Sequence, residues 1–253
     1  MPVPETLKCV AFKIPANRLF ALLMTIVCLL TTMSCLVFLV SQVSPKNFWM
    51  VEIIQSLNRL FNLDGEANIP SWYSSSTLLI ASALLATVAL FKARYKAPYH
   101  RHWKFLAVIF LYISMDEAAV IHEMLNKPLR LIFNTEGHVD SPWVVIAGLC
   151  LIFLAFTYAR FLLHLPSKIR YLFVISGVVF LTGAIGAEFV SFHGQPQPAT
   201  NTLSYQIPMT VEEFLEMAGV AIFIYAILLY LNEHIFVHLC SEATRSTTTA
   251  DDL

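Results

Sequence analysis

Charged side chains are scarce in this sequence. Only 13% of its 253 residues are charged, whereas 57% are hydrophobic, and the mean hydropathy is +0.68. A soluble domain needs far fewer apolar residues to build its core. The composition therefore predicts an all-α integral membrane protein that crosses the lipid bilayer several times.

Other features that the sequence lacks exclude several classes of function. The net charge is −1 and the basic residues lie in short loops, not in one patch, so nucleic acid is excluded as a partner. The five cysteines form no Cys-x-x-Cys pair and indicate no disulfide framework. No lysine lies in the interior of an apolar stretch, which argues against a retinal Schiff base of the microbial type.

Six apolar stretches are long enough to cross about 30 Å of hydrocarbon. Their expected bounds are 19–40, 70–91, 103–122, 143–163, 171–192 and 210–231. A cleaved signal peptide has a shorter apolar core than the first stretch, whose length favours a retained anchor. Between the first two, residues 48–61 alternate apolar and polar side chains at helical spacing, which predicts an additional amphipathic helix in the membrane interface.

Polar segments divide and flank these stretches. Residues 125–142 and 194–209 are expected to form irregular loops. At the level of domains, we expect an N-terminal segment 1–18, a six-helix membrane domain 19–240 and a disordered Ser/Thr-rich tail 241–253. The short loops and the size favour a bacterial inner membrane.

Basic residues are distributed unequally between the two sides of the six-span arrangement. One side receives twelve of the sixteen: Lys8, Lys13, Arg18, Lys92, Arg94, Lys96, Arg101, Lys104, Arg160, Lys168, Arg170 and Arg245. The other side receives Lys46, Arg59, Lys127 and Arg130. The positive-inside rule makes the first side cytoplasmic and places both termini there.

Acidic and histidine side chains interrupt the apolar stretches. Residues 114–123, SMDEAAVIHE, carry three carboxylates and an imidazole, although ionisable groups in a membrane are costly unless they are paired, solvated or metal-bound. The pattern recurs around Glu66, around Glu188 with His193, and at 212–216. All these segments fall at the non-cytoplasmic ends of their helices, which predicts one shared site.

Helical spacing restricts which of these residues face the site together. Residues four or seven apart share a face, so Asp116 can pair with Glu123, and Glu212 with Glu216. Glu117 with His122, and Glu188 with His193, are five apart and diverge by about 140° unless the helix end unwinds. Structural roles remain open as well. Glu213 stands at capping-box spacing from Thr210, and Glu212 lies in an expected first turn.

Clustered carboxylates repel one another, and a cation that they ligate jointly removes this repulsion. The sequence therefore predicts a site for a divalent metal ion: zinc, iron or manganese. The expected metal ligands are Asp116, Glu117, His122, Glu188 and His193, and the expected catalytic, proton-transferring groups are Glu123 and Glu216. The Glu-x-x-His motif of ferritin-like di-iron proteins is absent among these residues.

Three functions fit such a site. The leading hypothesis is a metal-dependent hydrolase or oxidoreductase that acts on a lipid or another membrane-delivered substrate. A proton or cation transporter or relay would need a polar path to the cytoplasmic face, and the inner halves of the stretches offer few polar residues for one. The third is a non-catalytic subunit or sensor with a membrane-protein partner. A nucleophile among Ser74, Ser75 and Ser76 is a weaker alternative, because serines at helix entries usually bond to the backbone.

Overall fold

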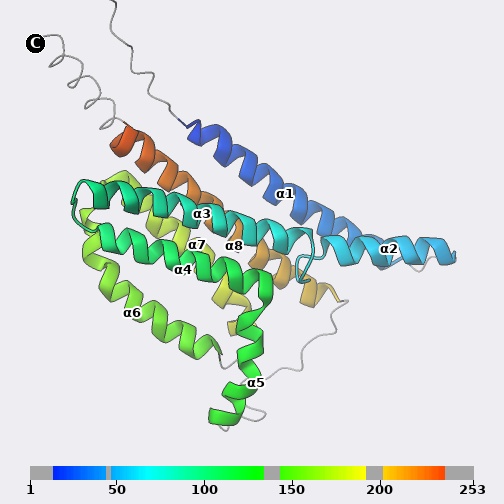
Figure 1. Ribbon diagram of the computed structural model, residues 1–253. Helices are drawn as coiled ribbons and strands as arrows, with labels where there is room; N and C mark the ends of the chain where they lie inside the picture. Colours follow the sequence, from blue (N-terminus) through cyan, green and yellow to red (C-terminus); the bar gives the residue numbers. More distant parts are fainter. Residues whose placement is uncertain (1–13, 44–46, 134–142, 192–201, 237–253) are drawn as a thin grey trace, which may run out of the picture.

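The computed structural model describes residues 14–43, 47–133, 143–191 and 202–236, and these form an all-helical bundle without strands (Figure 1). In chain order the α-helices are α1 (Ala16–Ser41), α2 (Phe48–Phe61), α3 (Ile69–Arg94), α4 (His100–Ala119), α5 (Ile121–Phe133), α6 (Trp143–His164), α7 (Ser167–Ser191) and α8 (Leu203–Tyr230). A short π-helix, η1 (Leu231–Phe236), extends α8. The predicted all-α fold is confirmed.

Five of the described helices are long and apolar enough to cross a membrane: α1, α3, α6, α7 and α8. The sixth expected span corresponds to α4, which does not qualify because charged residues lie near both its ends. Nevertheless α4 runs along α3 (Figure 1), with Ser82 Oγ donating to Ala107 O at 2.7 Å near the middle. The charges of α4 therefore lie beside an apolar candidate span.

The helix that carries the acidic motif ends earlier than the sequence predicts. It stops at Ala119, because Val120 adopts the left-handed conformation (φ 56°, ψ 41°). That conformation costs an ordinary residue about 1–2 kcal/mol, and β-branched residues rarely adopt it. The chain then leaves the axis of α4 and continues as α5 (Figure 1), so the whole of the predicted loop 125–142 that the structure describes, residues 125–133, is helical.

The last long helix begins earlier than predicted. α8 starts at Leu203, so residues 203–209 of the expected loop are helical despite Pro208. Thr210 and Glu212 consequently lie in the interior of α8. The capping-box and first-turn explanations for the acidic residues that follow Thr210 are therefore wrong, and the position of these residues needs another reason.

The core of the bundle forms around α8, which packs against α1, α3 and α7. Its residues from Met217 to Tyr230 are almost all buried, and Trp103 of α4 is packed against Phe161, Phe173 and Tyr230. α1 is joined to the bundle by Tyr73, whose hydroxyl donates to Leu23 O at 3.0 Å. By contrast, α6 exposes most of its apolar side chains, as expected for a helix in contact with lipid.

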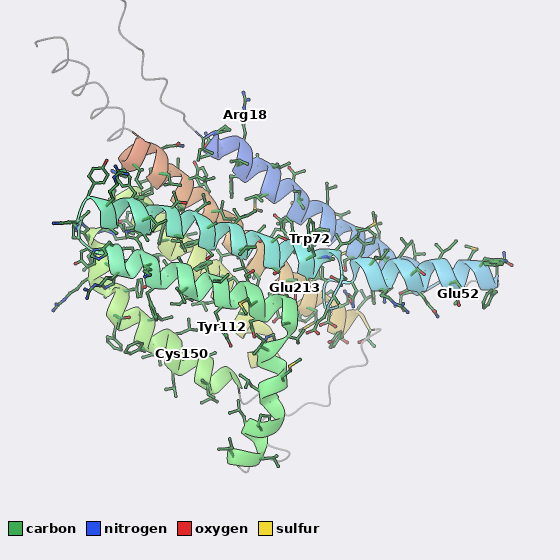
Figure 2. The ribbon with its side chains drawn as sticks, in the orientation of Figure 1. Arg18, Glu52, Trp72, Tyr112, Cys150 and Glu213 are labelled. Atoms are coloured by element: carbon green, nitrogen blue, oxygen red, sulfur yellow. The ribbon has the colours of Figure 1, made fainter. Side chains whose placement is uncertain are left out.

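Opposite charges gather at opposite ends of the bundle. At one end Ile14 and Asn232 exchange two hydrogen bonds, Lys92 lies over the Tyr230 ring, and Lys168 pairs with Glu233 at 3.4 Å. Figure 2 places Arg18 toward this end and Glu213 toward the other. The two ends of the described chain thus meet at the basic end.

Candidate functional site

A small cavity lies between α3, α4, α7 and α8, toward the acidic end of the bundle. Its volume is about 20 Å³, which is room for about one water molecule. Two carboxylates line it, Glu117 from α4 and Glu216 from α8, beside Ser74 and Thr77 of α3. Apolar side chains form the rest of the wall: Leu78, Ile113, Phe180, Met217 and Val220.

Two glycines let α7 approach this part of α8 closely. A Cβ atom on Gly183 would lie 2.7 Å from Glu212 O and 3.0 Å from Glu216 Cγ. A Cβ atom on Gly219 would lie 2.8 Å from the backbone nitrogen of Phe180. Small residues permit such backbone contact in membrane bundles. The position of Glu216 is therefore fixed by backbone packing.

On the opposite side of the cavity, two serines join α3 to α4. Ser75 Oγ donates to Ser114 O, and Ser114 Oγ donates to Ser75 O, both at 2.8 Å. Thr77 Oγ1 donates to Ser74 O at 2.9 Å. These bonds give Ser75 a structural role, as serine usually has at helix entries, and they hold Glu117 at a fixed distance from α3.

Further carboxylates surround the cavity. Glu213 interacts electrostatically with Glu216, Glu117, Glu212 and Asp64. Glu66 acts on Glu117 in the same way. Three of the four acidic segments expected from the sequence thus meet: the turn before α3, the end of α4 and the first half of α8. Among the described side chains, which do not include those of Lys127 and Arg130, no Lys or Arg pairs with Glu117, Glu213 or Glu216.

The aromatic hydroxyl of Tyr205 ties the start of α8 to this acidic region. It donates a hydrogen bond to Asp64 Oδ2 at 3.0 Å. Asp64 precedes the α3 entry, where Asn68 accepts from Ser71 N at 3.0 Å and its own backbone N–H donates to Ser71 Oγ, forming a capping box. The turn that holds Asp64 and Glu66 is therefore anchored on both sides.

The left-handed break at Val120 turns His122 back onto Asp116. The backbone N–H of His122 donates to Asp116 Oδ1 at 2.8 Å, and His122 Nδ1 lies 2.9 Å from Asp116 Oδ2. A carboxylate acceptor requires the hydrogen on Nδ1, so a neutral His122 presents the lone pair of Nε2 away from Asp116. This is how carboxylates orient metal-bound or proton-accepting histidines.

This geometry bears on two expectations about Asp116. Each of its oxygens accepts a hydrogen bond from His122, so Asp116 orients that ring, while its role as a metal ligand stays a prediction. It also does not share a helix face with Glu123, since the helix breaks between them. The side chain of Glu123 lies outside the described residues, as do the side chain of Glu188 and the whole of His193.

The predicted set of five metal ligands is not assembled in the part of the chain that the structure describes. Glu117 and His122 are neighbours at the α4–α5 junction, and Glu117 faces Glu216, which the sequence assigned to proton transfer. Yet among the side chains that the structure describes, which exclude those of Glu123 and Glu188, no three from Asp, Glu, His or Cys are arranged to hold a metal ion. The metal-binding prediction is not supported there.

Two polar groups near the acidic residues escaped the sequence reasoning. Thr210 Oγ1 and Asn126 Oδ1 are buried and lack a hydrogen-bond partner among the described residues. Thr210 precedes Glu213 by three positions and Asn126 follows His122 by four, so each shares a helix face with a candidate site residue. Buried oxygens of this kind usually have a partner such as water or an ion. Only tertiary structure reveals their burial.

Comparison with known proteins yields a family but no activity. No curated protein and no solved structure matches the chain. A family model described as a domain of unknown function, DUF8692, matches residues 19–231, from the first turn of α1 to the residue after α8. The match covers most of the chain and every element of the candidate site, so the protein belongs to the DUF8692 family.

Proposed function

We propose that this protein is a membrane enzyme whose carboxylate–histidine site binds a divalent cation and acts on a lipid or another membrane-delivered substrate. The observation that carries the proposal is that Glu117 and Glu216, from different helices, face one water-sized cavity and have no basic partner among the side chains that the structure describes. A cation shared between the two carboxylates would offset their repulsion and desolvation.

The surrounding groups fit this chemistry. His122, oriented by Asp116, offers Nε2 as a ligand or proton acceptor. The unpartnered oxygens of Thr210 and Asn126 suit a site that is completed by water or an ion. A bound divalent ion would polarise a water molecule or a substrate oxygen, while a neighbouring carboxylate exchanges the proton.

A site open to one side of the membrane is favoured over a transport path. Below the cavity the bundle is filled mainly by buried apolar residues such as Leu85, Val88, Ala226 and Ile227, and the described side chains form no charged path toward the basic end. We place the site at the non-cytoplasmic face of a six-span protein, with α4 as the sixth span and both termini in the cytoplasm. The membrane we propose is the bacterial inner membrane.

Metal content tests the proposal. Elemental mass spectrometry of the detergent-purified protein is expected to find zinc, iron or manganese at near one ion per chain, and a Glu117→Ala, Glu216→Ala variant is expected to lose it. Glu52→Ala, an acidic residue on the exposed α2, serves as the matched control and is expected to keep the metal. Equal metal content in all three proteins, or none in any, would reject the site.

A further inference from the structure

Thr210 differs from the other threonines of the described helices. In a membrane helix the hydroxyl of a threonine commonly donates to a carbonyl one turn earlier. Every other threonine in these helices does so, for example Thr25 to Ala21 O at 2.8 Å and Thr182 to Val178 O at 2.7 Å. Thr210 Oγ1 is buried and has no hydrogen-bond partner among the described residues. Because it does not bond to its own helix, its hydroxyl suits a water molecule or an ion.

Thr210 lies in the middle of a polar face of α8. Gln206 precedes it by four residues and Glu213 follows it by three, so the three side chains succeed one another along one side of the helix. Gln206 is only 7% exposed, so this face is turned into the bundle and not toward lipid. The same side of α8 continues with Met217 and Val220, which are apolar and line the cavity. The polar face therefore runs from the start of α8 to the cavity and stops there.

Glu213 connects the outer end of this polar face to the cavity. It interacts electrostatically with Asp64, which Tyr205 ties to the start of α8. It interacts in the same way with Glu216 and Glu117, which line the cavity. α8 itself carries no Lys, Arg or His. A polar path lined by carboxyl groups attracts cations and repels anions.

We propose that the polar face of α8 is a hydrated entry route by which a divalent cation passes from the acidic end of the bundle to the cavity. The inference rests on the proposed function, since it supplies the path to that site. The amide oxygen of Gln206, the hydroxyl of Thr210 and the carboxylate of Glu213 replace part of the water shell of the ion in turn, because hard divalent cations prefer oxygen ligands. The apolar side chains of Met217 and Val220 end the route at the cavity.

Cysteine substitution with cadmium as the probe tests the route on the full chain. In a background with all five cysteines replaced by serine, Thr210→Cys places a single thiol on the route. Gln206→Cys places one nearer the entrance and carries the test if the first variant does not fold. Each protein is held in phosphatidylcholine nanodiscs, and size-exclusion chromatography verifies the fold.

Two conservative substitutions on α7 provide matched controls. Thr182 is exposed on the bundle surface and precedes Gly183, whose Cβ would contact Glu216, so Thr182→Cys places a thiol at the level of the site but toward lipid. Ser176 is 3% exposed and lies one turn nearer the basic end than Phe180 of the cavity wall, so Ser176→Cys places a thiol in the core beyond the route.

Added Cd²⁺ is expected to produce the ultraviolet absorption of a cadmium–thiolate bond several-fold faster in the Thr210→Cys and Gln206→Cys proteins than in either control. Carboxylates give no such absorption, so the signal reports on the route and not on the cavity. Equal rates in all four proteins, or no absorption from either route variant, would overturn the proposal. The metal content of the wild type reports separately on the cavity: bound metal there without a signal at Thr210→Cys and Gln206→Cys rejects the route alone.

Discussion

Replacing Gly219 by leucine is expected to prevent the protein from forming a stable bundle. The first side-chain atom would meet the backbone of Phe180 at 2.8 Å, and backbone cannot rotate away as a side chain can. Overpacking a core with extra methylenes costs about 1–3 kcal/mol even where side chains can yield. The expected measurement is loss of the monodisperse peak in size-exclusion chromatography, with Gly219→Ala lowering the thermal midpoint by several degrees.

Gly177 on α7 provides the matched control. A Cβ atom there would meet nothing within 4 Å. Gly177→Leu is expected to keep the peak and to leave the midpoint equal or slightly higher, because leucine favours a helix by about 1 kcal/mol over glycine. If Gly219→Leu behaves like Gly177→Leu, α7 and α8 do not approach as closely as described.

A double variant, Glu117→Gln with Glu216→Gln, is expected to make the metal-free protein more stable. The substitutions keep the shape of both side chains and replace two ionisable groups that face one cavity with neutral amides. Ionising either carboxyl group there costs desolvation and repels the other carboxyl group, and the two amides avoid both costs. The thermal midpoint after chelation should therefore rise by several degrees in the variant.

The same variant should lose the response to metal. Ligands that bind only the folded state stabilise it by mass action, so added zinc or manganese should raise the midpoint of the wild type and leave that of the variant unchanged. Glu233→Gln, at the basic end of the bundle, is the control and should retain the metal response. A lower metal-free midpoint in the double variant would show that both carboxylates stabilise the fold.

Hydropathy and periodicity were sufficient to predict much of the fold. The amphipathic segment 48–61 coincides with α2 at both ends, and α6 ends within one residue of its predicted bound. The break at Val120 was not predictable, because a β-branched residue in the left-handed conformation contradicts its own preference and is imposed by the surrounding structure. The early start of α8 was missed because Pro208 normally ends or kinks a helix.

The candidate site, like the fold, could be predicted from the sequence only in part. Depth along the helices correctly indicated that Glu66, Glu117 and Glu216 would lie at one end of the bundle. Their individual roles depended on details that spacing does not contain. Because the helix bends after Ala119, Asp116 contacts His122 and not Glu123, with which it was expected to share a face. Only helix packing shows that Thr77 lines the cavity. Hydropathy and helical spacing predict how far along the helices a site lies, whereas only tertiary contacts determine which residues belong to it.

Anomalous X-ray diffraction from crystals of the protein purified with zinc tests the central claim most directly. The account predicts a peak at the zinc edge in the cavity between α4 and α8, about 2.0–2.2 Å from carboxylate oxygens of Glu117 and Glu216. A peak elsewhere in the protein, or a zinc-loaded crystal with no peak between these carboxylates, would contradict it.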